Sequence, residues 1–255
     1  MTDVATPQRT AIVTGASSGI GAAIALTLGR SGWRVGIGAR RREPLADVAA
    51  AIVEAGGTVL AHPLDVALDD SIDGFVELVE AEFGAIDAVV SNAGVSLPGL
   101  VHELSLDDLD SEIAINLRAP IVLARRVLPA MLERGSGDLV FVSSENAVVP
   151  RTFQAGYTAT KMGLEGLARV LRMELEGTGI RSTIVRPGPT ETAFGRDWDA
   201  ALIQRILQSW KEWGVQRHYD WLPPESVANA VAAALDAPPG THLDVIQVMP
   251  ERLRR

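Results

Sequence analysis

The chain has 255 residues, of which 47% are hydrophobic and 22% charged, and it contains no cysteine. This composition is typical of a globular protein with a large apolar core, and it excludes disulfides, a thiolate nucleophile and cysteine-ligated metals. The formal net charge of −9 argues against a nucleic-acid partner or binding to an anionic membrane. The four histidines are scattered and form no short metal-binding motif, so we expect no metal site.

The first residues, MTDVATPQRT, lack the basic segment and apolar run of a signal peptide. The uncharged stretch from Thr10 to Gly29 is interrupted by glycines, so a strand, a tight loop and a helix fit it better than a membrane span. We therefore expect a cytoplasmic protein that has no membrane partner.

Short apolar, β-branched runs alternate with helix-like segments along the whole chain. Runs that are apolar on both faces are typical of parallel strands covered by helices on both sides. The predicted strands are 10–14, 35–39, 58–62, 88–91, 139–142, 180–185 and 243–248. This order predicts one α/β domain over residues 1–255, with a doubly wound, Rossmann-type, seven-stranded parallel sheet and helices on both faces.

Some of the predicted helices have recognisable ends. We expect Ser71 to cap a helix that runs to Gly84. Ser105 and Asp108 form a capping-box pattern, and Pro224 is predicted to open the last helix.

The first predicted strand is followed by the glycine-rich sequence TGASSGIG at 14–21. Glycine lets the backbone approach a pyrophosphate closely, and the N–H groups at a helix start attract its charge. A glycine-rich turn without a ligand is the alternative, but the position after the first strand favours dinucleotide binding. The candidate cofactor contacts are Gly15, Ser17, Ser18, Gly19, Ile20 and Gly21.

The second predicted strand ends in three arginines, Arg40, Arg41 and Arg42, with no acidic residue before Glu43. An acidic residue there would bind the ribose 2′-hydroxyl, whereas arginine accommodates a 2′-phosphate. The pattern favours NADP(H) over NAD(H), with Arg40 and Arg41 as candidate ligands. For Arg41 and Arg42, a solvated charge run at a helix start stays an open alternative.

Tyr157 and Lys161 are four residues apart in a helical pattern and so share a face. An adjacent ammonium favours the phenolate and would allow proton transfer near neutral pH, although such a pair alone is more often a surface pair. Ser144 lies 13 residues before Tyr157, at the end of a strand. Asn116 lies in mid-helix, where Asn is unfavourable unless its side chain or a bent backbone has a function.

These motifs resemble those of the short-chain dehydrogenase/reductase family, in its single-domain, NADP(H)-preferring branch, over nearly the whole chain. Asn116, Ser144, Tyr157 and Lys161 match the catalytic tetrad, and Tyr157 and Lys161 would also contact the cofactor. Ser91 stands where the family more often has Asn. The further cofactor contacts that the resemblance implies are Asp65, Val66, Asn92, Ala93, Gly94, Pro187, Gly188, Thr190 and Thr192.

The resemblance also implies a role for each member of the tetrad. Tyr157 would protonate a carbonyl oxygen, or take the alcohol proton in reverse, and Lys161 would lower its pKa and bind the nicotinamide ribose. Ser144 would donate to the substrate oxygen, and Asn116 would hold a water that links Lys161 to solvent. The implied function is an NADP(H)-dependent oxidoreductase that interconverts a ketone or aldehyde and an alcohol.

Two other classes of function use the same fold: a regulator, and a different chemistry such as dehalogenation or epimerisation. An NADP(H)-binding regulator without significant turnover would not need the complete tetrad. A dehalogenase would lack the glycine loop, and an epimerase would be longer and carry another glycine spacing. An oxidoreductase therefore fits the sequence better than either.

Residues 190–222 follow the predicted nicotinamide loop and, by resemblance, form the lid over the substrate. They contain four of the five tryptophans, at 198, 210, 213 and 221, together with Phe194 and Tyr219. This aromatic density predicts a broad apolar pocket and a bulky apolar substrate, with Phe194 and Trp198 as candidate contacts. Packing of these rings on the body or in a subunit contact is the alternative.

Glu145, which follows Ser144, is a third candidate substrate contact. In the pocket it would disfavour anionic substrates and could pair with a cationic or hydroxyl-rich one, but we expect it to face solvent.

The long predicted helices 106–134 and 153–176 are those that pair across subunits in the resembled family. We expect a homodimer or homotetramer, more specifically a homotetramer. The apolar residues that would supply the contact, or belong to the core, are Val127, Leu128, Met131, Leu167, Val170 and Leu171.

Overall fold

A computed structural model describes residues 8–193, 195, 197–215 and 220–251. Its centre is a seven-stranded sheet with the order β3-β2-β1-β4-β5-β6-β7, in which every neighbouring pair is parallel. The predicted fold and strands are confirmed, with ends that differ by at most two residues. The strands are β1 (Thr10–Thr14), β2 (Arg34–Ala39), β3 (Thr58–Pro63), β4 (Ala88–Ser91), β5 (Gly137–Val142), β6 (Ile180–Pro187) and β7 (Val245–Val248).

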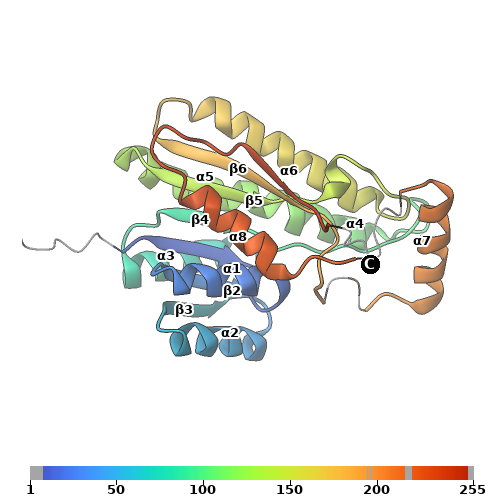
Figure 1. Ribbon diagram of the computed structural model, residues 1–255, viewed down its shortest axis with the longest axis horizontal. Helices are drawn as coiled ribbons and strands as arrows, with labels where there is room; N and C mark the ends of the chain where they lie inside the picture. Colours follow the sequence, from blue (N-terminus) through green and yellow to red (C-terminus); the bar gives the residue numbers. More distant parts are fainter. Residues whose placement is uncertain (1–7, 194, 196, 216–219, 252–255) are drawn as a thin grey trace, which may run out of the picture.

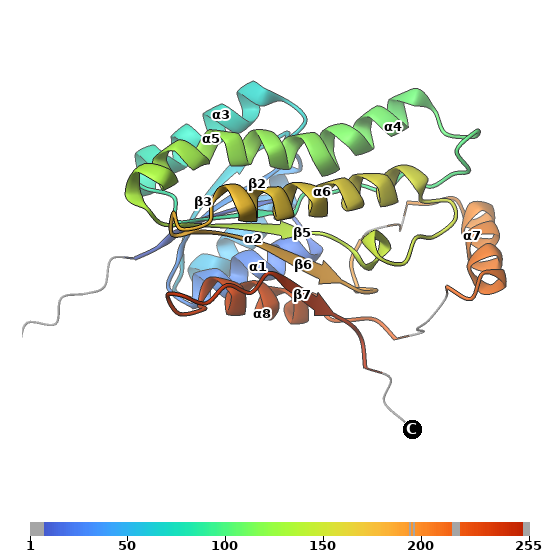
Figure 2. The ribbon, with the colours of Figure 1, turned by 90° about the horizontal axis from the view of Figure 1, so that it is seen from above.

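Helices cover both faces of the sheet (Figures 1 and 2). One face carries α1 (Gly19–Arg30), α2 (Arg42–Glu54) and α8 (Pro224–Leu235). The other carries α3 (Asp69–Phe83), α5 (Ala119–Arg134) and α6 (Ala155–Glu174). Helix α4 (Leu106–Ile113) leads into α5, and α7 (Ala200–Glu212) lies apart, past the arrowhead of β6 (Figure 2).

The buried strands divide their side chains between two apolar cores. In β1, Ile12 packs in the core beneath α3, α5 and α6, whereas Ala11 and Val13 pack beneath α1, α2 and α8. Alternate residues of a strand point to opposite faces, so a strand covered on both sides must be apolar throughout. This requirement explains why the strands could be recognised as continuous apolar runs.

The carboxyl ends of β1 and β4 form the switch point of the sheet. The two strands are neighbours, and the order of the sheet proceeds outward from them in both directions. The hydroxyl of Thr14 accepts from the backbone N–H groups of Asn92 and Ala93, both at 3.1 Å, which holds the two strand ends together. In doubly wound sheets, ligands bind in the crevice outside this point.

The helix ends follow the sequence prediction in two places and differ in one. The Ser105 hydroxyl caps α4 by accepting from the Asp108 N–H at 3.0 Å, and α8 begins at Pro224. The prediction that Ser71 caps the next helix is wrong, because α3 begins at Asp69. The Ser71 hydroxyl instead accepts from the N–H of Asp65 at 3.1 Å, outside the helix.

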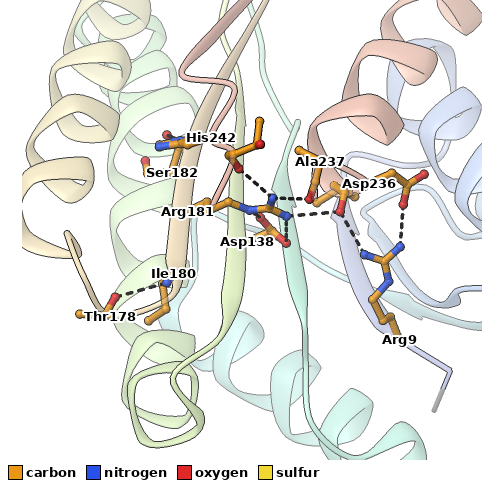
Figure 3. A network of polar contacts seen from close by, with 11 residues as sticks. Arg9, Asp138, Thr178, Ile180, Arg181, Ser182, Asp236, Ala237 and His242 are labelled. Atoms are coloured by element: carbon orange, nitrogen blue, oxygen red, sulfur yellow. Dashed lines mark hydrogen bonds and ion pairs between the residues drawn. The ribbon is translucent and has the colours of Figure 1, made fainter. Parts of the chain in front are cut away.

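The amino ends of β5 and β6 are tied to each other and to the end of α8 (Figure 3). Arg181 of β6 forms a two-pronged ion pair with Asp138 of β5, at 2.6 and 3.0 Å. The same guanidinium donates to the carbonyls of Leu235, Ala237 and Thr241 at the end of α8.

Among the described residues, no helix is both long and apolar enough to cross a membrane.

Candidate active site

A cavity of about 830 Å³ lies along the carboxyl edge of the sheet. It is bounded by the loops after β1, β2, β3, β4, β5 and β6, and by α7. The predicted site residues that line it are Gly15, Ser17, Ser18, Gly19, Ile20, Gly21, Arg40, Arg41, Asp65, Val66, Asn92, Ala93, Gly94, Ser144, Glu145, Tyr157, Lys161, Pro187, Gly188, Thr190, Thr192 and Trp198. Asn116 is fully buried behind the wall, and Phe194 lies outside the described residues.

The glycine loop leaves the start of α1 open to the cavity. A Cβ on Gly21 would lie 2.4 Å from both the Gly15 carbonyl oxygen and the Asn92 side chain, so the loop requires glycine there. Ser18 precedes α1 but makes no side-chain cap. The N–H groups of the first turn therefore face the cavity without a capping side chain, a donor set that fits a phosphate group.

Two arginines lie at the rim beside this loop. Arg40 and Arg41 are both exposed and line the cavity, and Arg41 donates to the hydroxyls of Ser17 (3.2 Å) and Ser18 (2.8 Å). Arg42 is the first residue of α2 and does not line the cavity. The donors of Arg40, Arg41 and the two serines fit a second phosphate.

Tyr157 and Lys161 are buried one turn apart on α6. The Lys161 Nζ lies 5.7 Å from the centre of the Tyr157 ring and donates to the Val142 carbonyl at 2.9 Å. Burial raises the pKa of Tyr157 to about 12, although a hydrogen bond with Ser144 opposes the rise, and burial lowers the pKa of Lys161 to about 8. In the protein without cofactor, burial thus changes the Tyr157 pKa more than the effects that lower it. Tyr157 therefore carries its proton at neutral pH and can donate it.

Ser144 stands at the end of β5, just before a 3-10 turn (Glu145–Ala147). Its oxygen accepts from the Asn146 N–H at 3.2 Å. That contact uses a lone pair of the Ser144 oxygen, and the Ser144 hydroxyl also forms a hydrogen bond with Tyr157, so the two hydroxyl groups lie side by side at the cavity.

Asn116 lies where the helix is distorted, and its side chain is fully used in hydrogen bonds. It lies in a π-helical segment (Ala114–Arg118) between α4 and α5. Its carboxamide accepts from the N–H of Val95 and donates to the carbonyl of Val95, both at 2.8 Å, and it also donates to Thr160 at 3.2 Å. Asn116 thus joins the loop after β4 to α6, the helix that carries Tyr157.

The expectation that Glu145 faces solvent is wrong. Glu145 is 5% exposed and forms an ion pair of 2.6 Å with Arg151, which pairs its charge within the protein. Arg151 also lines the cavity and was missed, because no motif marks it. The sequence does contain a signal, since Glu145 and Arg151 are the only charged residues between Asp138 and Lys161.

The tryptophans of segment 190–222 differ in their surroundings. Trp198 and Trp210 line the cavity and also bind the body, since their indole N–H groups donate to the carbonyls of Ser96 (3.2 Å) and Thr152 (3.0 Å). Trp221 lines the cavity, whereas Trp213 is 72% exposed and does not. Both interpretations, pocket wall and packing on the body, therefore hold for Trp198 and Trp210.

Among the residues that the structure describes, no group of three or more His, Asp or Glu gathers in a way that could hold a metal ion. The polar side chains that line the cavity carry phenol, ammonium, hydroxyl, guanidinium, carboxamide and carboxylate groups.

Comparisons with known proteins agree with this fold. The family model described as short chain dehydrogenase matches residues 9–202. The glycine betaine reductase ATRR of Emericella nidulans is 32% identical over 243 residues, which cover 95% of this chain and 19% of that protein. The chain thus spans about a fifth of the length of that relative.

Two solved structures are similar over nearly the full length of both chains. One is a metagenomic short-chain oxidoreductase in complex with NADP, with 33% identity, a TM-score of 0.80 and coverage of 96% of this chain and 98% of that chain. The other is a variant of actinorhodin polyketide ketoreductase with NADPH, with 30% identity, a TM-score of 0.81 and coverage of 95% and 96%.

Proposed function

Since the chain belongs to the short-chain dehydrogenase family, we propose that it is an NADP(H)-dependent oxidoreductase that interconverts a ketone or aldehyde and an alcohol. The observation that carries this proposal is the meeting of Ser144, Tyr157 and Lys161 in one cavity with the glycine loop. A proton donor, a donor for a developing oxyanion and a phosphate-binding helix start are the parts that a carbonyl reductase requires.

The cofactor would lie between the glycine loop and the residues after β6. The N–H groups at the start of α1 would bind the pyrophosphate, and Arg40 and Arg41 the 2′-phosphate. Asp65, Asn92 and Thr192 line the same cavity and would contact the remaining parts. The two similar structures hold NADP and NADPH, which supports NADP(H) as the cofactor of this chain.

In this proposal the bound cofactor supplies or accepts the hydride, and the side chains of the protein manage the proton. Ser144 donates to the substrate oxygen as negative charge develops on it. Tyr157, which is a phenol at neutral pH, donates its proton to that oxygen during reduction. Lys161, buried beside the Tyr157 ring, would contact the nicotinamide ribose.

The substrate proposed is a bulky, apolar and uncharged carbonyl compound. The cavity wall formed by α7 and its neighbours consists largely of Ile203, Ile206, Leu207, Trp210, Val215 and Trp221. Because Arg151 pairs with Glu145, neither of these two side chains presents an isolated charge to a substrate. We propose that segment 190–222 is the substrate lid.

We also propose a cytoplasmic homodimer or homotetramer built on α5 and α6. Of the residues weighed for this contact, Val127, Met131 and Leu171 lie in the core, whereas Val170 is 50% exposed. Sedimentation velocity of the purified protein tests the assembly directly.

The function is tested by following nicotinamide absorbance with NADPH or NADH and a panel from small keto acids to bulky ring ketones. We expect faster turnover with NADPH than with NADH, and with bulky ketones than with keto acids. Tyr157→Phe should reduce kcat by about 10²–10⁴-fold, because it removes the general acid.

Tyr157→Phe should still bind NADPH, which a fluorescence titration measures. Binding without turnover across the whole panel, in both directions, would favour the regulatory function instead. If neither cofactor binds the wild-type protein, the proposed cofactor site at the glycine loop is wrong, and the proposed function is wrong with it.

A further inference from the structure

Arg151 joins three separate parts of the active site. Its guanidinium donates to the Glu145 carboxylate at 2.6 Å and to the Asn146 side chain, on the turn that follows Ser144. Its charge also lies 5.3 Å from the centre of the Trp210 ring on α7. The side chains of Arg151 and Glu145 are each 7% exposed, so the pair is shielded from water.

The same contacts hold the start of α6. The Asn146 side chain donates to Gln154, the residue just before α6 and three positions before Tyr157. Phe153, between Arg151 and Gln154, has a φ of +66°, a conformation that a bulky side chain rarely adopts. A strained backbone of this kind persists only where its surroundings hold it. The side-chain hydrogen bonds of Arg151 and Gln154 lie on either side of Phe153, and its carbonyl accepts from the Gly99 N–H at 2.9 Å.

Charged groups on four segments lie near Tyr157. Glu112 comes from α4, Glu145 from the turn after β5, Arg151 from the loop before α6, and Lys161 from α6 itself. Glu112 is buried, and its carboxylate accepts from the N–H of Leu97 at 2.8 Å. Both carboxylates disfavour a phenolate at Tyr157, and the Arg151 guanidinium favours one.

From this arrangement we propose that Arg151 is a positioning residue that neutralises Glu145 beside Tyr157 and thereby sets the pH range in which Tyr157 exchanges its proton. The proposal rests on the proposed function, because it concerns the acid of that reaction. Without Arg151, a buried and unpaired carboxylate would face the phenol, and the phenolate needed for alcohol oxidation would form only at higher pH.

Four variants separate the charge of Arg151 from its contacts. Arg151→Met removes the cation and leaves the Glu145 carboxyl without its partner, and Glu145→Gln removes the anion. Glu145→Gln with Arg151→Met removes both charges and keeps the protein free of an unpaired buried carboxylate. Arg151→Lys keeps the charge but cannot reproduce the planar contact with two partners at once.

The first readout is the pH dependence of kcat for alcohol oxidation with NADP⁺, on the alcohol of the best ketone in the panel. We expect Arg151→Met to move the midpoint upward by about one pH unit and Glu145→Gln to move it downward. The double variant and Arg151→Lys should lie near the wild-type midpoint. At a pH below the midpoint, an upward shift of one pH unit makes kcat of Arg151→Met roughly tenfold lower than that of wild type.

The second readout needs no substrate. The chain contains two tyrosines, Tyr157 and Tyr219, so protein labelled with ¹³C at the tyrosine ring carbon that bears oxygen gives two resonances, and Tyr157→Phe assigns them. The Tyr157 resonance should begin to titrate at lower pH in Glu145→Gln than in wild type, and at higher pH in Arg151→Met. Circular dichroism at each pH identifies any variant that has unfolded.

The outcomes differ clearly. Opposite shifts in the single variants with recovery in the double variant support the proposal. If the variants lose activity or thermal stability but share the wild-type midpoint by both readouts, Arg151 only holds the structure and the proposal is wrong. If no ketone is reduced but the resonances shift in the expected order, the proposed function fails while the charge relation stands.

Discussion

Tyr157 and Lys161 lie one helical turn apart, and burial moves their pKa values in opposite directions. The pKa of Tyr157 rises to about 12 and that of Lys161 falls to about 8, because desolvation disfavours the phenolate and the ammonium alike. Each shift therefore gives the protein a stability that depends on pH. The pH ranges in which the Tyr157 and Lys161 shifts change the stability differ enough for the two contributions to be measured separately.

The window for Lys161 lies between its folded pKa of about 8 and its ordinary value of 10.5. There the unfolded chain binds more protons than the folded one, so stability rises with pH. Between pH 8 and 9.5, below the range in which Tyr157 contributes, we expect the wild-type free energy of unfolding to rise by about 1–2 kcal/mol relative to Lys161→Met. Urea denaturation of both proteins without cofactor measures this, and parallel pH profiles would contradict it.

Arg41 offers a second test at the scale of one residue. Arg41→Ala should weaken NADPH binding by roughly 10–100-fold, the range expected for one charged hydrogen bond, and leave NADH binding almost unchanged. Arg42→Ala is the matched control, because Arg42 does not line the cavity. Fluorescence titration with both cofactors gives the two ratios. An equal loss of affinity for NADPH and NADH in Arg41→Ala would show that Arg41 does not bind the 2′-phosphate.

At the scale of elements, α6 connects the catalytic residues to α4 through a close contact. A Cβ on Gly156 would lie 2.1 Å from a carboxylate oxygen of Glu112 and 3.0 Å from Leu109. Glu112 cannot move freely, because it is buried and accepts from the N–H of Leu97. The small residue at 156 is thus what lets α4 and α6 approach. Gly166, on the exposed side of the same helix, has nothing within 4 Å of such a Cβ.

The two glycines predict opposite effects of the same substitution. Gly166→Ala should stabilise the protein by about 0.5–1 kcal/mol, because alanine is the better helix former. Gly156→Ala should destabilise it by about 1 kcal/mol, since the overpacking cost exceeds that gain. Denaturant unfolding of the two variants and of wild type measures these free energies. Stabilisation by both substitutions would show that the Glu112 side chain moves aside for the new methyl group without a loss of stability.

For the molecule as a whole, the two edges of the sheet have different roles, one in the candidate active site and the other in stability. The carboxyl edge carries the glycine loop, Ser144 and the cavity. At the amino edge, Arg181 ties β5, β6 and the end of α8 together through Asp138 and three carbonyl groups. These edges are separated by the length of the strands, so changes at one need not disturb the other.

Arg181→Met should therefore lower stability without changing catalysis. We expect a loss of about 2–4 kcal/mol, because Asp138 and three carbonyl groups lose a partner in a partly buried site. The kcat of the protein that remains folded should stay within about twofold of wild type, because the cavity is not touched. Arg172→Met is the control, since the Arg172–Asp244 pair is 3.7 Å long and half-exposed, and its loss should cost at most about 1 kcal/mol.

Chemical denaturation and initial rates, measured on the same preparations, test both expectations. A fall in kcat that follows the loss of stability would mean that the two edges are coupled.

The sequence alone was sufficient for the strands, the parallel sheet and the place of the glycine loop. These features depend on local pattern: a strand buried on both faces must be apolar throughout, and a loop that approaches a phosphate needs glycine. Asn116 was also recognisable, because a residue unsuited to a helix interior indicates a local distortion. The π-helical segment at Ala114–Arg118 is that distortion.

Only the tertiary structure decided which partner each polar side chain takes. Ser71 accepts from Asp65 rather than capping α3, Glu145 turns inward to Arg151, and Arg41 binds the serines of the glycine loop. The sequence determined the elements because burial and backbone geometry act on each residue locally. It did not determine these partners, because a hydrogen bond or an ion pair depends on which groups the folded chain brings within about 3 Å of each other.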